Sequence, residues 1–149
     1  MNINISKKGP LKGKIIPPPD KSISHRIVFF ASLAEGESNI KNFLIAHDPL
    51  STVNILRSLG IEIEINTRQK EIIIKGKGLH GLKEPEDVLN CENSGTTIRL
   101  SAGLLAGQNF FSVLTGDASL RRRPLKRVIT PLRMMGAKLK ARAEDTLAP

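Results

Sequence analysis

The sequence contains no tryptophan and no tyrosine, and five phenylalanines are its only Phe, Tyr or Trp residues. Because proteins commonly hold single-stranded nucleic acid by stacking bases on aromatic side chains, this scarcity argues against such a function. The single cysteine, Cys91, excludes an internal disulfide and is typical of a reducing compartment. One cysteine and three histidines also leave no Cys/His cluster for zinc, and no Walker or dinucleotide-binding motif is present.

Long apolar runs and acidic residues are scarce as well. No run approaches the roughly 18 residues that a membrane span needs, and the N-terminus lacks the basic region and apolar stretch of a signal peptide. We therefore expect a cytoplasmic protein. The sequence has 14 Asp and Glu residues and 23 Lys and Arg residues, which gives a formal net charge of +9. Such a surface attracts anions, with nucleic acid, acidic membranes and phosphorylated metabolites as the candidates.

The first residues predict short strands that end at a run of prolines. Ile3 and Ile5 alternate with polar residues, and residues 14–16 are a second strand signal. Three prolines at positions 17–19 then stop regular structure, because proline lacks a backbone donor and has a fixed φ. This opening segment is therefore expected to be separate from the units that follow.

A helix, a strand, a second helix and a hairpin are predicted next. From Ser22 the apolar spacing is helical, and Gly36 ends the helix before a strand at 38–43. The face expected in the core consists of Ile23, Ile27, Phe30, Ala31 and Ala34. Asp48 and Pro49 favour a helix start with the carboxylate as N-cap. The apolar residues expected to follow are Val53, Leu56 and Leu59 in this helix, and Ile61, Ile63, Ile65, Ile72 and Ile74 in a β-hairpin after Gly60.

The same order of elements recurs in the second half. Residues 33–36 (LAEG) resemble residues 104–107 (LLAG), and each is followed by a predicted strand, the second at Phe110–Phe111. Further on, Val53, Leu56, Gly60 and Ile63 match Ile129, Leu132, Gly136 and Leu139. Several matches in one order indicate an internal duplication. Residues 138–141 are the first strand of the second hairpin, whose partner would lie beyond Pro149; we therefore expect a fragment of a longer protein.

Residues suited to anion binding gather at three predicted helix starts. At the first, Lys21, Ser22 and Arg26 surround free backbone N–H groups. At the second, residues 93–99 (NSGTTIR) combine Gly95, which lets a ligand approach the backbone, with Thr96 and Arg99, while Asn93 and the threonines are expected to cap the helix. At the third, residues 121–123 are three arginines that precede Pro124 and a predicted fourth helix, and an arginine before a helix can pair with a phosphate. Capped helices with solvated basic residues are the alternative interpretation of each.

Other reactive side chains are better explained by structural roles. His25 and His47 have no evident carboxylate partner, and His80 lies in a glycine-flanked loop. Cys91 follows apolar residues, so we expect a buried thiol and not a nucleophile.

At these residues the sequence resembles the 5-enolpyruvylshikimate-3-phosphate synthase (3-phosphoshikimate 1-carboxyvinyltransferase) family. The matching stretches are PDKSISHR at 19–26, NSGTTIRL at 93–100 and LTGDASLRRRP at 114–124. The resemblance implies an α/β (α+β) fold of repeated βαβαββ units in an inside-out barrel, incomplete here. It assigns residues 1–19 to an opening strand segment of the other domain, 20–83 to the first unit and 84–149 to a second unit that is cut short.

The resemblance also implies the reaction and the residues that serve it. Such an enzyme transfers the enolpyruvyl group of phosphoenolpyruvate to the 5-hydroxyl of shikimate 3-phosphate, in the pathway to chorismate and aromatic amino acids, without metal or cofactor and as a monomer. By position, Lys21 would be catalytic and contact both substrates. The other assignments are Ser22 and Arg26 to shikimate 3-phosphate, Gly95 and Arg123 to phosphoenolpyruvate, and Thr96 and Arg99 to support of that pocket. The family's acid and base residues would lie beyond Pro149, so we expect the chain alone to be inactive.

Two alternatives remain at this point. The related UDP-N-acetylglucosamine enolpyruvyltransferases share the architecture but rely on a cysteine in a mobile loop, whereas Cys91 directly precedes the 93–99 motif. A basic, non-catalytic module that binds anions or nucleic acid would also fit the net charge of +9. Leu100 replaces a proline that many synthases have after the arginine, so glyphosate sensitivity does not follow from the resemblance.

Overall fold

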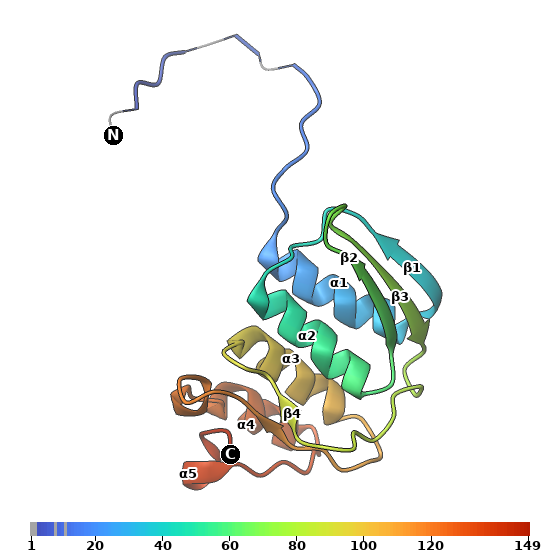
Figure 1. The fold of residues 1–149 in the computed structure, drawn as a ribbon. Helices are drawn as coiled ribbons and strands as arrows, with labels where there is room; N and C mark the ends of the chain where they lie inside the picture. The colour runs from blue at the N-terminus through green and yellow to red at the C-terminus, as the bar shows by residue number, and fades with distance from the viewer. Residues whose placement is uncertain (1–2, 8, 11) are drawn as a thin grey trace.

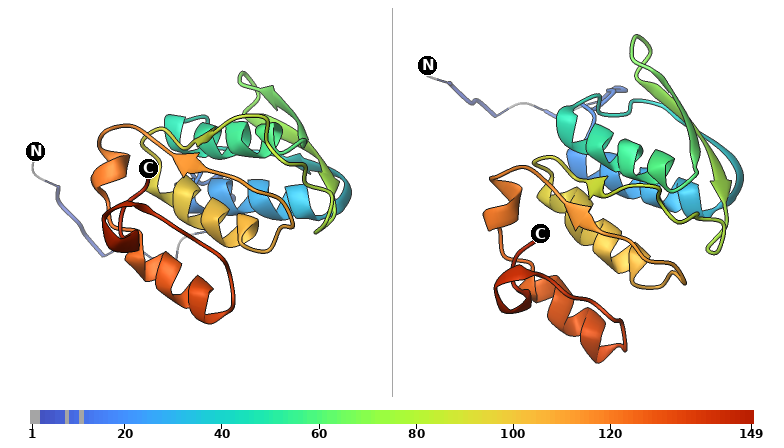
Figure 2. Two further views of the ribbon diagram at one scale, coloured as in Figure 1. Left: turned by 90° about the horizontal axis from the view of Figure 1, so that it is seen from below. Right: turned by 60° about the horizontal axis from the view of Figure 1, so that its bottom comes forward.

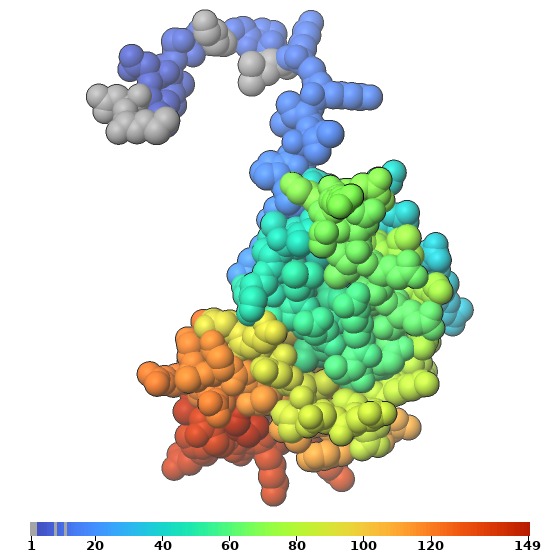
Figure 3. All heavy atoms as spheres, in the orientation of Figure 1, coloured from blue at the N-terminus to red at the C-terminus, as the bar shows by residue number. Residues whose placement is uncertain are grey.

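The computed structural model describes residues 3–7, 9, 10 and 12–149. The described residues before Asp20 form no helix or strand and lead away from the body of the molecule (Figures 1 and 3). Ile5, Ile15 and Ile16 are each at least 87% exposed. The strands predicted at 3–5 and 14–16 are therefore wrong. A strand requires a neighbouring backbone to complete its hydrogen bonds, and the described residues provide none for this segment.

The first repeat has the predicted order of elements. It consists of α1 (Lys21–Leu33), β1 (Glu35–Ile40), α2 (His47–Ser58), β2 (Glu62–Asn66) and β3 (Glu71–Lys77). The strands form an antiparallel sheet of order β1-β3-β2, in which Ile63 pairs with Ile74. The predicted hairpin is thus confirmed. The strand predicted at 38–43 starts earlier, at Glu35, because α1 ends at Leu33 and β3 pairs with the chain from that point.

The buried face of α1 differs from the predicted one. Ile23 and Phe30 are 59% and 66% exposed, although their spacing placed them in the core. The buried face consists of Ser24, His25, Val28, Phe29, Ala31 and Ser32. The small and polar residues of this face allow α1 to pack closely, and Ser24 Oγ accepts a hydrogen bond from the Leu44 N–H at 3.1 Å. Close packing and hydrogen bonds to the rest of the chain therefore outweighed the apolar periodicity.

The second repeat retains only part of the predicted order. It contains β4 (Leu89–Asn90), α3 (Gly95–Leu105), β5 (Leu114–Thr115), the 3₁₀ turn η1 (Leu120–Arg122), α4 (Lys126–Met134) and the short α5 (Arg142–Asp145). β4 and β5 pair in parallel. The strand predicted at 110–111 lies instead at Leu114–Thr115, where β4 offers a partner. Residues 138–141 form no strand, since none of the described residues pairs with them as β3 pairs with β2.

Helices α1 to α4 lie side by side, and their first residues lie at the same end of the molecule (Figures 1 and 2). The core runs between these helices and beneath the sheet, with Val28, Val53, Leu56, Leu59, Ile72, Ile74 and Ile98 at 0–1% exposure. Val53, Leu56 and Leu59, predicted as the apolar face of α2, are confirmed as core residues. Because the helices are parallel, the positive ends of their dipoles share one end of the molecule.

Candidate anion-binding site

The start of α1 carries Lys21, which pairs with a carboxylate from α2. Asp20 is the N-cap of α1 and accepts a hydrogen bond from the Ile23 N–H at 2.7 Å. The Lys21 ammonium forms an ion pair with Asp48. The prediction that Asp48 caps α2 is wrong: the N-cap is Ala46, without a side-chain hydrogen bond, and Asp48 lies in the first turn. Its carboxylate therefore serves Lys21 rather than the backbone of its own helix.

Ser22 and Arg26 are exposed at the same helix start. They are four residues apart and consequently lie on one face of α1. The Ser22 hydroxyl and the Arg26 guanidinium thus face solvent together. A phosphate group accepts hydrogen bonds from donors of these kinds.

At the start of α3, the cap is Ser94. Its Oγ accepts from the Thr97 N–H at 3.2 Å, so the prediction that Asn93 or the threonines cap the helix is wrong. Asn93 instead donates to Asp117 at 2.7 Å and accepts a hydrogen bond from the Arg123 guanidinium. Asn93 thereby holds the arginine that precedes α4 beside the start of α3.

Two guanidinium groups converge on Gly95. Arg99 Nη1 donates to the Gly95 carbonyl at 3.0 Å. A Cβ atom on residue 95 would lie 2.6 Å from Arg99 Nη1 and 3.3 Å from Arg123 Nη1. Glycine is therefore the residue that leaves both guanidinium groups in place at this helix start. Thr96, the next residue, is half-buried. The three-residue set predicted from separate motifs, Gly95, Arg99 and Arg123, is one cluster in the folded chain.

A basic groove of about 700 Å³ continues from this cluster along α4. It is lined by Arg99, Arg123, Pro124, Lys126, Arg127, Thr130 and Pro131, a set without a carboxylate. Burial lowers the pKa of the Arg99 guanidinium, and the nearby charges of Arg127 and Arg123 lower it further. A bound anion would relieve this repulsion. Sequence reasoning missed Lys126 and Arg127; the available signal was their position in a first helical turn, where cations oppose the helix dipole.

A buried polar network connects α1, the middle of α2 and the start of α3. It consists of His25, Thr52, Thr97 and Ser94, each 0% exposed. His25 Nδ1 lies 2.7 Å from Thr52 Oγ1, and Thr52 Oγ1 lies 2.8 Å from Thr97 Oγ1. Thr97 in turn donates to Ser94 Oγ at 2.7 Å. The sequence contains no periodic signal for this network, because its members come from three different helices.

The remaining candidates have structural explanations, with one correction. Cys91 is 0% exposed, which confirms that it is a core residue, and burial raises the pKa of its thiol to about 12. His80 is exposed in a loop, as predicted. The prediction that His47 lacks a carboxylate partner is wrong, since its Nε2 lies 2.8 Å from Glu92 Oε2.

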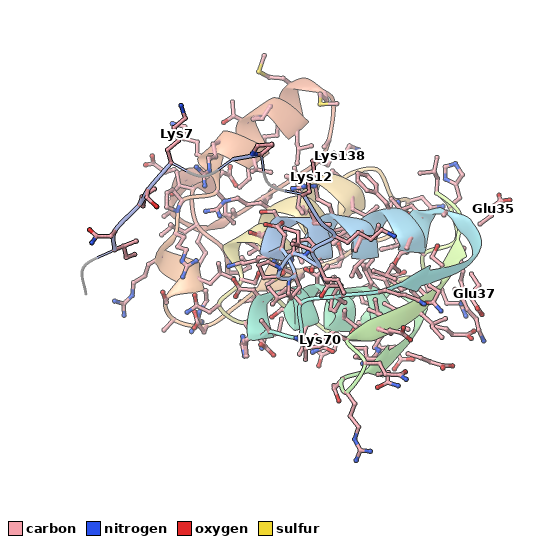
Figure 4. All side chains as sticks on the ribbon, turned by 90° about the horizontal axis from the view of Figure 1, so that it is seen from above. Lys7, Lys12, Glu35, Glu37, Lys70 and Lys138 are labelled. Carbon is pink, nitrogen blue, oxygen red and sulfur yellow. The ribbon has the colours of Figure 1, made fainter. Side chains whose placement is uncertain are left out.

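The helix starts carry acidic as well as basic side chains, since Asp48 pairs with Lys21 there. Glu35 and Glu37 project from β1 at the far end of α1, on the opposite side of the molecule from Lys7 of the N-terminal segment (Figure 4). Within residues 3–7, 9, 10 and 12–149, no group of three or more His, Cys, Asp or Glu residues has a metal-binding arrangement. Among the helices of that same part of the chain, none has the length and apolarity needed to cross a membrane.

The chain is an α/β repeat protein whose parallel helices present lysine, arginine and a glycine backbone at their starts. The model of the EPSP synthase (3-phosphoshikimate 1-carboxyvinyltransferase) family matches residues 5–149. The chain therefore belongs to the EPSP synthase family. Its mixed fold of helices and strands agrees with the predicted fold class of repeated units, of which this chain holds an incomplete set.

Individual relatives agree with this assignment. The chain is 62% identical over 149 residues to a 3-phosphoshikimate 1-carboxyvinyltransferase of Thermodesulfovibrio yellowstonii, covering 100% of this chain and 34% of that protein. For the protein of the same name from Alkaliphilus metalliredigens, the identity is 55% over 144 residues, covering 97% and 33%. An EPSP synthase structure from Acinetobacter baumannii superposes with a TM-score of 0.86 at 44% identity, covering 92% of this chain and 31% of that one. The chain thus spans about a third of the length of these relatives.

Proposed function

We propose that this chain provides part of the substrate site of an enolpyruvyl transferase. The complete enzyme would move the enolpyruvyl group of phosphoenolpyruvate to the 5-hydroxyl of shikimate 3-phosphate and release phosphate. In this proposal Ser22 and Arg26 bind shikimate 3-phosphate. Gly95 and Arg123 bind phosphoenolpyruvate, and Lys21 contacts both substrates.

The convergence of two guanidinium groups on Gly95 carries the proposal. Phosphoenolpyruvate has a phosphate and a carboxylate, and planar guanidinium groups recognise both by paired hydrogen bonds. No carboxylate lines the groove beside these arginines, so the groove favours a dianion over a neutral ligand. Thr96 and Arg99 support the pocket, because Arg99 holds the Gly95 carbonyl at 3.0 Å.

In the same proposal, Lys21 takes the catalytic role. An ammonium group has three donors, so the ion pair with Asp48 leaves two for substrates. A cation beside the reacting groups would stabilise negative charge that develops during addition and elimination of phosphate. The general acid and base would come from residues of the complete enzyme outside this chain.

The division of the chain and its setting belong to the same proposal. Residues 1–19 would join the other domain of the complete enzyme, which agrees with an N-terminal segment that leads away from the body (Figure 3). Residues 20–83 and 84–149 would be successive units. The single, buried Cys91 supports a cytoplasmic setting, and we expect the complete enzyme to be a monomer.

Calorimetric titration with phosphoenolpyruvate tests the proposal. Arg123→Gln should weaken binding by about ten- to a hundredfold, because a charge-assisted hydrogen bond is worth roughly 1.5–3 kcal/mol. Arg122→Gln is the matched control, since Arg122 is an exposed member of the same arginine triplet and does not line the groove. Equal binding by both variants, or no binding by the wild type, would contradict the proposal.

Turnover provides a second test. We expect negligible phosphate release when the chain is incubated with both substrates, because the proton-transfer groups would not be present. Robust phosphate release by the chain alone would show that this division of labour is wrong.

A further inference from the structure

The polar network of His25, Thr52, Thr97 and Ser94 joins the two ends of the proposed substrate site. Each end lies next to a site residue: His25 precedes Arg26 in α1, and Ser94 precedes Gly95 in α3. The links of 2.7, 2.8 and 2.7 Å run through Thr52 of α2 without an exposed atom between them. Displacement of one helix start would therefore be transmitted to the other.

Burying four polar side chains between helices costs more free energy of desolvation than burying apolar side chains of the same size. A buried hydroxyl or imidazole loses its hydration and must recover it through hydrogen bonds. Apolar side chains tolerate small shifts, whereas the three links of 2.7–2.8 Å specify one distance and one direction between the elements that they join. Here the specified distance is that between the starts of α1 and α3.

The surroundings of His25 make Thr52 its anchor. Within the described residues, the buried His25 Nε2 has no hydrogen-bond partner, so the contact with Thr52 orients the ring. Burial lowers the pKa of His25; the carboxylate of Asp48 opposes this effect and the ammonium of Lys21 adds to it. The neutral ring can occupy this position without an unpaired buried charge.

We propose that His25, Thr52 and Thr97 are positioning residues for the enolpyruvyl transfer site. They hold the start of α3 in register with the start of α1, so that one anion contacts Lys21 and the Gly95–Arg123 cluster together. The inference rests on the proposed function for the identity of that anion. It predicts that a ligand held by both helices depends on the network, whereas a ligand held by α1 alone does not.

Substitutions at Thr52 separate these two ligands. Thr52→Val removes the central hydroxyl with little change of shape, and Thr52→Ser restores it. We expect Thr52→Val to weaken phosphoenolpyruvate binding about tenfold, because a displaced Gly95–Arg123 cluster would form poorer charge-assisted hydrogen bonds with the anion. Binding of shikimate 3-phosphate, which we assign to α1, should change by less than about twofold, and Thr52→Ser should bind both ligands like the wild type.

Ser32→Ala is the control for simple loss of a buried hydroxyl. Ser32 is 0% exposed and donates to the Val28 carbonyl of its own helix at 2.7 Å, so it joins no two helices. This variant should bind both ligands like the wild type. If Thr52→Val weakens both ligands equally, or neither, the network is only part of the core and the inference is overturned.

A measurement without ligand keeps the test independent of the proposed function. Residual dipolar couplings of the α1 and α3 amides report the relative orientation of the two helices. A changed orientation in Thr52→Val, with wild-type orientation in Thr52→Ser and Ser32→Ala, is the expected result. If the wild type fails to bind phosphoenolpyruvate, the proposed function falls, while an unchanged orientation in Thr52→Val overturns the positioning role.

Discussion

Single residues in this protein owe their chemistry to where they are buried. Cys91 and His25 are both reactive residue types, and both are 0% exposed. Water is the main stabiliser of their charged forms, so burial favours the neutral thiol and the neutral imidazole. Lys21 and Asp48, which are partly exposed, form an ion pair with each other. The helix starts thus combine a partly exposed ion pair, Lys21 with Asp48, and a buried, hydrogen-bonded His25 beneath it.

We predict that Cys91 is inert toward thiol reagents in the folded chain. Burial raises its pKa to about 12, so almost no thiolate exists at neutral pH, and the reagent cannot reach the sulfur. A chromogenic disulfide reagent should react only as the chain unfolds in urea. Rapid labelling of the native protein would restore the alternative of a reactive cysteine, as in the related enolpyruvyltransferases.

We predict that His25 makes folding pH-dependent. Folding lowers the pKa of His25, so just below the ordinary histidine pKa the unfolded chain binds a proton at this residue more readily than the folded chain does. Its contribution to stability is complete above the ordinary histidine value of about 6.5 and declines as the pH falls below it. Urea unfolding at about pH 7.5 and about pH 5.5 should show a larger loss for the wild type than for His25→Asn. Parallel losses in the two proteins would contradict this effect.

At the scale of elements, glycines control how closely segments approach. Gly76 of β3 lies against the end of α1, where a Cβ atom would be 2.2 Å from the Ala31 carbonyl oxygen and 2.3 Å from that of Ala34. Backbone atoms cannot move aside as a flexible side chain can. The contact between the sheet and α1 therefore depends on the absence of a side chain at this position.

We predict that Gly76→Ala destabilises the chain by about 2–4 kcal/mol, through overpacking. The control is Gly103→Ala in α3, because nothing lies within 4 Å of a Cβ atom there. That change should stabilise the chain by about 0.5–1 kcal/mol, since alanine is the better helix former. Both values are measured by urea unfolding. A neutral Gly76→Ala would mean that α1 and β3 do not approach as closely as described.

At the scale of the whole molecule, the N-terminal segment and the body are nearly independent. Asn42 donates to the Pro17 carbonyl at 3.0 Å, which ties the end of the segment to the body. The isoleucines before it are exposed. Hydrophobic side chains in water contribute no burial energy, so this segment gains its function, in our proposal, from contact with the other domain.

We predict that deletion of residues 1–16 leaves the stability of the body unchanged within about 0.5 kcal/mol. The deletion keeps Pro17, the N-cap Asp20 and all of α1. Thermal unfolding of the full and shortened chains provides the comparison. A markedly lower melting temperature after the deletion would show that the segment packs on the body in solution.

The order of elements in the first repeat was accessible from the sequence by itself. Apolar periodicity and turn residues are local signals, and they identified α1, α2, α3 and the β2–β3 hairpin, although the caps predicted for α2 and α3 were wrong. The predicted duplication rests on residue patterns that recur in the same order. The basic residues at helix starts were recognisable since the dipole and free N–H groups make their position meaningful.

Only the tertiary structure decided which of these residues meet. His25 and Thr52 are 27 positions apart, and Thr52 and Thr97 are 45 apart, so no local pattern records their contact. Ile23 and Phe30 are exposed for the same reason. Periodicity predicts that a helix has an apolar face, but the elements that pack against the helix determine which face is buried. The meeting of Arg99 and Arg123 at Gly95 likewise depends on the packing of α3 beside α4, because distant segments acquire a shared site only when the core has placed them together.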